Sequence, residues 1–302
     1  MVIVCVEDKF DLDGRRKQWC KSVNATESMN DNVQTNFAAV RGIEIAYINV
    51  GTGPAVLMLH GFPFDKSMWA DQLAALTAAG FRVVVPDLRG FGETKAGGEI
   101  STMDDMARDA AALLDHLQIG EAVVCGLSMG GYVAFEFVHL FPARVLCLVL
   151  AGTRAPADNE QEKAGREQQV QTMLRAGMVP ISIATLPKLL SEQTRAEKPG
   201  VVKHVRTMIT LSDPKGAAAA QRGMAARRDY TDDLPNIKAS ALIIVGREDP
   251  IRPVTDAEFM HERIPNSRLE IIDDAAHMTN VEQAAEFNDL LVSFLNELTM
   301  VK

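Results

Sequence analysis

The sequence predicts an α/β protein: a mostly parallel eight-stranded sheet with helices on both faces and a helical insertion. Short segments rich in Val, Ile and Leu alternate with helix-length segments of periodic apolar residues up to residue 153. The alternation stops between residues 154 and 234, which have helical spacing and no strand pattern, and resumes at residue 235. Such alternation indicates parallel strands, because each connecting helix must cross back over the sheet.

The composition is that of a globular protein and excludes several classes of partner. The chain has 302 residues, of which 47% are hydrophobic and 24% are charged, and no apolar run is long enough to span a bilayer. A net charge of −9 disfavours binding to nucleic acid and to anionic membrane surfaces. Four cysteines in a chain of this length do not form a disulfide framework, and the first residues are a poor signal peptide. We therefore expect a cytoplasmic protein.

The N-terminal part should contribute four strands after an extension. Residues 1–35 are polar and without periodicity, so we interpret them either as a disordered extension or as the result of a start assigned too early, with Met29 as the alternative start. The segment "FAAVRGIEIAYINVG" alternates around an Arg-Gly turn and predicts a hairpin. "AVLMLHG" and "FRVVVPD" predict buried strands, and helical spacing follows over Met68–Ala79 and Thr102–Leu117.

The remaining elements divide into a core and an insertion. "AVVCG" predicts a strand, followed by a helix from Gly130 to Leu140 and by the strand "RVLCLVLAG". Residues 154–234 are expected to form a helical cap over the sheet edge, and residues 36–153 and 235–302 the core. The last predicted elements are the strand "ALIIVG", a helix over Asp256–Arg263, the strand "RLEII" and a helix over Val281–Leu298.

A serine between glycines, in "VVCGLSMGGY", is the strongest candidate for a catalytic residue. Ser128 stands at a predicted strand-to-helix turn, with Gly126 and Gly130 on either side. A glycine-rich turn alone would also explain this composition. A sharp turn of this kind, however, exposes the serine hydroxyl and points the backbone N–H of Met129 toward whatever the serine attacks. We therefore predict that Ser128 is a nucleophile.

A serine nucleophile needs a base and a group that orients the base. Of six histidines, His277 lies in a loop after the last predicted strand and can reach the same sheet edge as Ser128. His116, His139, His204 and His261 are expected on the surface, and His60 is expected to shape its loop. Asp249 follows the strand "ALIIVG" and is the predicted acid. Glu248 is a competitor, and Asp249 could also be an ordinary turn residue.

The order Ser128, Asp249, His277, together with the loop "HGFP" at residues 60–63, resembles the α/β-hydrolase family. The resemblance implies an oxyanion hole made by the backbone N–H groups of Phe62 and Met129. "DLRGFGET", at residues 87–94, is similar to another family loop, in which Asp87 and Arg89 hold the loop together. Further motifs are similar to the branch of 3-oxoadipate enol-lactonases, small esterases, lactonases and cofactor-free perhydrolases. One departure is Ala284, where many relatives have proline.

These observations predict a serine hydrolase that cleaves small, uncharged carboxylic esters, lactones included, through an acyl-enzyme and without metal or organic cofactor. A low-turnover ligand receptor of the same fold and a perhydrolase are the alternatives. An oxidoreductase is disfavoured because "GTG" at residues 51–53 lacks a third glycine and does not open a helix. A metallohydrolase is disfavoured because "HER" at 261–263 has no second histidine four residues later. Ser128 excludes family members that use an aspartate nucleophile. The acyl group and the oligomeric state stay open.

Overall fold

The structure is a computed structural model that describes residues 9–10, 16–17, 34–95 and 98–299. The chain divides into two units, Met1–Gln34 and Thr35–Lys302. In the first unit, β1 (Lys9–Phe10) and β2 (Arg16–Lys17) pair as a short antiparallel ladder. The other residues of the expected extension, 34 and 35 excepted, lie outside the described residues.

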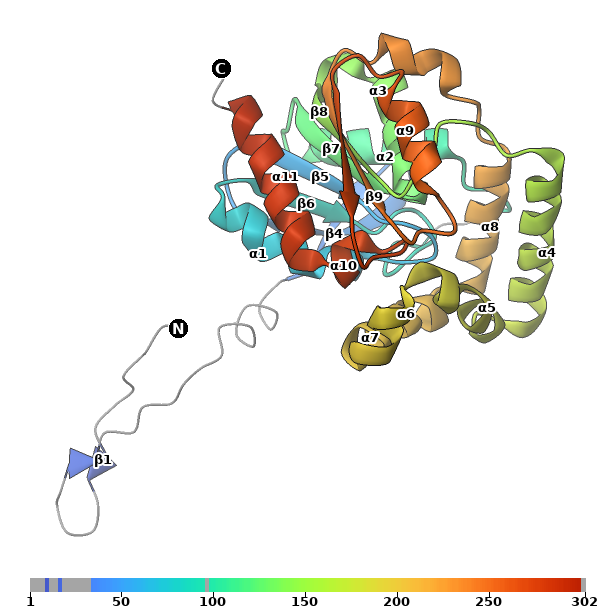
Figure 1. Cartoon of the computed structure of the whole chain (residues 1–302), viewed down its shortest axis with the longest axis horizontal. Coiled ribbons are helices and arrows are strands. Elements are labelled where there is room, and N and C mark those ends of the chain that lie inside the picture. The colour runs from blue at the N-terminus through green and yellow to red at the C-terminus, as the bar shows by residue number, and fades with distance from the viewer. Residues whose placement is uncertain (1–8, 11–15, 18–33, 96–97, 300–302) are drawn as a thin grey trace. The chain divides into compact units, whose positions relative to one another are not determined.

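One eight-stranded sheet forms the centre of the second unit, with the order β10-β9-β8-β7-β5-β6-β4-β3. Its strands are β3 (Asn36–Val40), β4 (Ile43–Val50), β5 (Ala55–Leu59), β6 (Arg82–Pro86), β7 (Ala122–Leu127), β8 (Val145–Ala151), β9 (Ser240–Gly246) and β10 (Ser267–Ile272). Only the β3–β4 and β4–β6 pairs are antiparallel. The predicted mostly parallel sheet is thereby confirmed (Figure 1).

The predicted hairpin is formed by β3 and β4. Its turn residues, Arg41 and Gly42, have φ angles of 46° and 78°. Positive φ at both central residues is what a two-residue turn needs to match the twist of its strands. Strands β5 and β7 are buried at every position, because helices cover the sheet on both faces.

The helices of the core lie on both faces of the sheet (Figure 1). They are α1 (Ala70–Ala78), α2 (Met103–His116), α3 (Met129–Leu140), α9 (Val254–His261), α10 (Thr279–Glu282) and α11 (Ala284–Thr299). Helix α1 packs against α11, and α2 packs against α3. The sequence analysis predicted α1, α2, α3 and α9 to within a few residues.

The predicted helix over Val281–Leu298 is wrong in one respect: it is two helices, interrupted at Gln283. This residue has φ −124° and ψ 55°, which lie outside the helical region. Helix α11 then begins at Ala284. The proline that many relatives have at this position would therefore be the first residue of the helix, a site where proline is favoured. The departure at Ala284 therefore concerns only the start of this helix.

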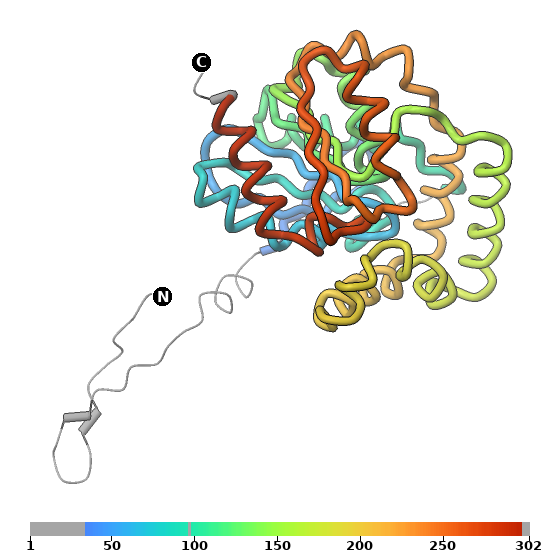
Figure 2. Tube along the Cα trace, in the orientation of Figure 1, coloured from blue at the N-terminus to red at the C-terminus, as the bar shows by residue number. Residues whose placement is uncertain are grey.

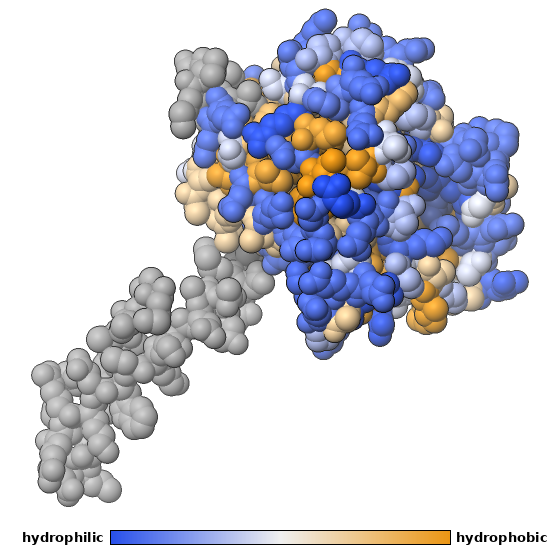
Figure 3. Space-filling view, in the orientation of Figure 1, coloured by the Kyte–Doolittle hydropathy of each residue, from blue (hydrophilic) through white to orange (hydrophobic). Residues whose placement is uncertain are grey.

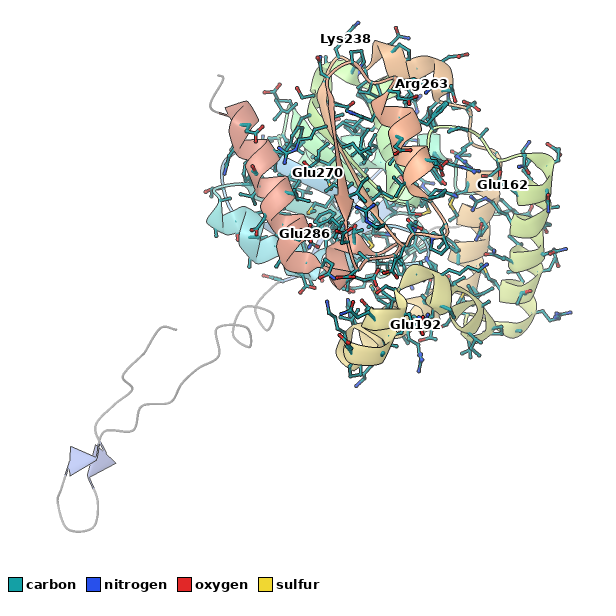
Figure 4. The ribbon with its side chains drawn as sticks, viewed as in Figure 1. Glu162, Glu192, Lys238, Arg263, Glu270 and Glu286 are labelled. Carbon is teal, nitrogen blue, oxygen red and sulfur yellow. The ribbon has the colours of Figure 1, made fainter. Side chains whose placement is uncertain are left out.

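Between β8 and β9 the chain is helical, as the spacing predicted. The five inserted helices are α4 (Glu160–Ala176), α5 (Val179–Leu189), α6 (Glu192–Glu197), α7 (Pro199–Leu211) and α8 (Pro214–Ala225), and they lie together beside the sheet (Figure 2). Helix α4 packs against α8, and α5 against α7. A capping box of Asn159 and Glu162 begins α4, with Glu162 visible in its first turn (Figure 4).

Apolar side chains fill the interior on both sides of the sheet, and the face seen in Figure 3 is largely hydrophilic with small hydrophobic groups. Cys125 and Cys147 are buried free thiols, as their apolar segments predicted. No helix among the described residues is both long and apolar enough to cross a bilayer.

Candidate active site

Ser128 stands at the sharp turn between β7 and α3. Its φ of 55° and ψ of −110° are a backbone conformation that residues other than glycine rarely adopt. The backbone holds it there: the Ser128 N–H donates to the carbonyl of Ala151, and its carbonyl accepts from Gly131 and from the Thr153 hydroxyl. The residue is half-buried, while Leu127 and Met129 beside it are buried. The turn thus presents only the serine side chain.

The surrounding glycines are required by the close approach of neighbouring backbone. A Cβ atom on Gly126 would lie 2.2 Å from the carbonyl oxygen of Gly130, and one on Gly130 would lie 2.0 Å from that of Leu59. A Cβ on Gly131 would meet the Thr153 side chain at 2.4 Å. The glycines therefore allow β5, β7 and the start of α3 to pack more tightly than any side chain permits.

His277 and Asp249 form a buried hydrogen-bonded pair. His277 Nδ1 lies 2.7 Å from Asp249 Oδ2, and the two residues are only 2% and 4% exposed. Because a carboxylate only accepts, Nδ1 carries the proton and Nε2 keeps a lone pair. The other carboxylate oxygen of Asp249 accepts from the backbone N–H groups of Ile251 and Arg252, which fixes the acid. Glu248, the competing acid, is exposed.

A cavity of about 130 Å³ brings Ser128 and His277 together. The core contributes Phe62, Pro63, Ser128, Tyr132, Ile251, Arg252 and His277 to its lining, and the inserted helices contribute Arg166, Gln169, Thr185, Leu189 and Met224. A larger cavity, of about 650 Å³, is lined by residues at the other ends of the strands, such as Ala55 and Val123, and by none of the predicted site residues. The chemistry expected of Ser128 therefore belongs to the smaller cavity.

The two predicted oxyanion donors flank this site. Phe62 follows β5 and lines the cavity, and Met129 is the first residue of α3. Among residues 34–95 and 98–299, neither backbone N–H donates to another group. Unsatisfied N–H groups at a helix start favour negative charge.

The residues expected to have structural roles have them. His60 donates from Nδ1 to the Gly61 carbonyl and accepts from the Leu88 N–H, and burial lowers its pKa, so it is neutral and shapes its loop. His116, His139 and His261 are exposed, and His204 is half-exposed.

The loop after β6 is likewise held by its own charged residues. Asp87 accepts from the Lys66 ammonium at 2.8 Å and from the backbone N–H groups of Lys66 and Glu93. Arg89 pairs with Asp109 at 2.6 Å. The prediction that Asp87 and Arg89 hold this loop is confirmed.

Several site residues were missed by the sequence analysis. Tyr132 stands one helical turn after Ser128, a spacing that places both on one face of α3 and was available as a signal. Arg252 follows Asp249 by three residues and carried no motif. Arg166 and Gln169 on α4 could not be assigned from a polar helix. Glu282 accepts from the N–H groups of Ser191 and Ala276, so it joins the inserted helices to the His277 loop.

No group of three or more His, Cys, Asp or Glu side chains in the described part of the chain is arranged to hold a metal ion.

Fold and site together define a class of protein. Three groups meet at one edge of the mostly parallel sheet: Ser128 at the turn after β7, Asp249 after β9 and His277 in the loop after β10. This is the arrangement of the α/β hydrolases. The chain belongs to this family: the model described as "alpha/beta hydrolase fold" matches residues 54–284.

Similar proteins include esterases and lactonases, which supports a hydrolase. "3-oxoadipate enol-lactonase 2" of Acinetobacter baylyi is 31% identical over 235 residues, covering 78% of this chain and 86% of that protein. A malate-bound thermophilic esterase from Thermogutta terrifontis is 40% identical with a TM-score of 0.85, covering 88% and 99%. A "non-heme haloperoxidase" of Rhodococcus erythropolis is 31% identical over 268 residues, covering 84% and 96%. The predicted resemblance to this branch is thereby confirmed.

Proposed function

We propose that the protein hydrolyses carboxylic esters, lactones included, through a covalent acyl-enzyme on Ser128. The observation that carries the proposal is the buried His277–Asp249 pair, which stands at the same cavity as the strained serine turn. The similarity to a named esterase and a named enol-lactonase supports the same reaction class.

In the first half-reaction, Ser128 Oγ attacks the ester carbonyl carbon while His277 Nε2 takes the hydroxyl proton. Asp249 holds the ring in the tautomer that leaves this nitrogen free, and it stabilises the imidazolium that forms. His277 then gives the proton to the leaving alkoxide as the carbon–oxygen bond breaks. An acyl-enzyme and an alcohol result; with a lactone, the alcohol stays attached to the acyl chain.

Negative charge develops on the carbonyl oxygen in both half-reactions. In this proposal the N–H groups of Phe62 and Met129 donate to that oxygen, and removing one such donor typically costs 100- to 1,000-fold in rate. In the second half-reaction His277 takes a proton from water, whose oxygen attacks the acyl carbon. His277 then gives this proton to Ser128 Oγ as the acyl carbon–Oγ bond breaks, which releases the acid and free Ser128.

The inserted helices act, in our proposal, as a cap on this site. Arg166 and Gln169 of α4, Thr185 and Leu189 of α5 and Met224 of α8 line the cavity opposite the core residues. Substrate selection should therefore reside largely in these helices, because the core supplies the reacting groups.

The proposal is tested with p-nitrophenyl esters of increasing chain length and a set of lactones. We expect many product equivalents per protein molecule, and Ser128→Ala should abolish turnover while leaving the melting temperature nearly unchanged. Phenylmethylsulfonyl fluoride should add mass at Ser128. Modification of another serine, with Ser128 untouched, would contradict the mechanism. Release that stops at one equivalent, while ligands still raise the melting temperature, would favour a low-turnover receptor.

Perhydrolysis is a second candidate, favoured by the similarity to a protein named as a non-heme haloperoxidase. Hydrogen peroxide would replace water as the attacking group on the acyl-enzyme, and the product would be a peracid. Peracid formation from acetate ester and peroxide, lost in Ser128→Ala, is the measurement that supports it.

A further inference from the structure

The cavity beside Ser128 is rich in hydrogen-bond donors and has no carboxylate in its lining. Arg166, Arg252, Tyr132 and Gln169 all line it, and none of the described lining residues is Asp or Glu. A neutral ester has weak acceptors only, so the Tyr132 hydroxyl proton, the Gln169 amide and the charge of Arg252 would have no matching group on the substrate first expected. Unpartnered donors in a cavity are costly unless a ligand satisfies them.

Arg252 carries a charge that no acid neutralises at close range. Its Nε and Nη2 donate to the Tyr132 hydroxyl oxygen at 3.2 and 2.5 Å, and Nη1 donates to the Ile251 carbonyl at 2.6 Å. No carboxylate of the described residues lies within 4.0 Å of its guanidinium, although Asp256 on α9 interacts with it at longer range. Asp249 is already occupied by His277 and by two backbone N–H groups.

The neighbouring arginines differ, because each of them forms an ion pair with a carboxylate. Arg154, Arg166 and Arg227 all form ion pairs with the buried Asp158, and Arg154 also pairs with Glu162. Arg252 is thus the guanidinium at this site whose side chain contacts only neutral acceptors.

Tyr132 adds a second free donor. Its hydroxyl oxygen accepts from Arg252, and no acceptor for its own proton is found in residues 34–95 and 98–299. Burial acts to raise the pKa of Tyr132, but the charges of Arg252, Arg227 and Arg166 outweigh it and lower the pKa below its ordinary value. The potential at this buried hydroxyl is therefore positive.

A chain of hydrogen bonds also fixes which end of Gln169 is free. Arg166 only donates, so the Gln221 oxygen must face it, at 2.8 Å. The Gln221 nitrogen then donates to the Gln169 oxygen, also at 2.8 Å. The Gln169 NH₂ group is left without an acceptor among the described residues, and Gln169 lines the cavity.

We propose that this cavity binds a carboxylate, so that the substrates are esters or lactones carrying one carboxylate a few atoms from the scissile carbonyl. Arg252 and Tyr132 are the carboxylate-binding residues, and the Gln169 amide is a third donor. Arg252 is the arginine of the lining that forms no ion pair among the described residues, so it can bind one carboxylate, and the small volume favours a carboxylate over larger anions. This inference rests on the proposed function, and it replaces the expectation of an uncharged ester.

The test compares two substrates that differ only in charge. Monomethyl succinate carries the carboxylate, and methyl succinamate replaces it with a neutral amide of the same shape. We expect the wild-type protein to prefer monomethyl succinate in kcat/KM. Because hydrogen bonds to a charged group contribute strongly to binding free energy, Arg252→Gln should lower this preference about 10- to 100-fold. Tyr132→Phe should lower it by a smaller factor.

Arg247→Gln is the matched control, because Arg247 lies in the same loop, is exposed and pairs with Asp273. It should keep the wild-type preference. An equal preference in wild type and Arg252→Gln, or no preference in wild type, would overturn the inference. If Arg252→Gln does not fold, Arg252→Lys decides: a reduced preference supports the inference, and an unchanged one overturns it.

Binding separates this inference from the proposed function. Calorimetry on Ser128→Ala should detect monomethyl succinate, and adding Arg252→Gln should abolish the binding. Such Arg252-dependent binding in a protein that turns over no ester would overturn the hydrolase proposal and support the anion site. Turnover of both esters that depends on Ser128 but not on Arg252 would do the reverse.

Discussion

At the scale of single residues, the site is defined by positions that the chain would not adopt without support. Ser128 holds a positive φ of 55°, and such backbone strain persists only where the surroundings determine it. The Ala151 carbonyl, the Thr153 hydroxyl and the first turn of α3 all fix this peptide. A rigid serine is useful to the proposed mechanism, since attack on an ester requires close alignment before the reaction begins.

The acid is the residue whose role is tested most directly. Asp249→Asn should lower kcat about 10,000-fold, because an amide can turn its NH₂ toward His277 Nδ1 and favour the wrong tautomer. Glu248→Gln is the matched control and should be nearly silent, since Glu248 is exposed. Steady-state kinetics on p-nitrophenyl acetate would measure both. A silent Asp249→Asn with a severe Glu248→Gln would mean that the acid is misassigned.

The glycines next to Ser128 make a second prediction at this scale. Gly130→Ala should destabilise the protein by about 1–3 kcal/mol or more and lower activity, because the new Cβ would lie 2.0 Å from the Leu59 carbonyl oxygen. Gly120→Ala, which meets nothing within 4 Å, should change the free energy of unfolding by less than about 0.5 kcal/mol. Urea unfolding of the two variants provides the comparison; equal stabilities would show that backbone relaxes around residue 130.

At the scale of elements, the inserted helices are joined to the core through buried charge. Asp158, after β8, accepts from Arg154 at 2.9 Å, from Arg227 beyond α8 at 2.7 Å and from Arg166 on α4. A second connection is made by Glu282 of α10, whose carboxylate accepts from the backbone N–H of Ser191, just before α6, and from that of Ala276 in the His277 loop. Burial raises the pKa of Glu282. The position of the cavity lining relative to Ser128 depends on both connections.

Asp158→Asn should destabilise the protein by about 3 kcal/mol or more, because it leaves Arg227, whose side chain is 0% exposed, without its anion. Burial acts to raise the pKa of Asp158, but Arg166 and Arg227 outweigh it and hold the pKa well below its ordinary value. The ionised carboxylate therefore stabilises the fold above the unfolded-chain pKa of about 3.9, and this contribution is lost as the pH falls below that value.

Denaturant unfolding at several pH values checks this prediction. The difference between wild type and Asp158→Asn should be constant from about pH 7 to pH 5 and should narrow below about pH 4. Asp104→Asn, which removes an exposed pair with Arg108, is the control and should cost less than about 1 kcal/mol. A difference that already narrows at neutral pH would contradict the lowered pKa.

At the scale of the whole molecule, the sequence predicted what depends on local pattern. The order of strands and helices follows from apolar periodicity, and the hairpin turn follows from Gly42, which tolerates positive φ. Ser128, Asp249 and His277 could be selected because each follows a recognisable strand. The break at Gln283 could not, because it coincides with tertiary contacts of Glu282, such as the hydrogen bond from the Ser191 N–H, 91 residues away in the chain. Arg252 and Gln169 became site residues only through tertiary packing.

The division of the chain into two units makes the last prediction. Every strand of the eight-stranded sheet and every residue of the cavity lies within Thr35–Lys302. A chain that starts at Met29 should therefore keep its activity and its melting temperature to within about 2 °C. A chain that starts at Ile43 also loses β3, which buries Ala38 and Val40 and pairs with β4 along its length, so it should melt more than about 5 °C lower. Scanning calorimetry and ester turnover are measured on both truncated chains. A melting temperature several degrees lower in the chain that starts at Met29 would show that residues 1–28 stabilise the second unit.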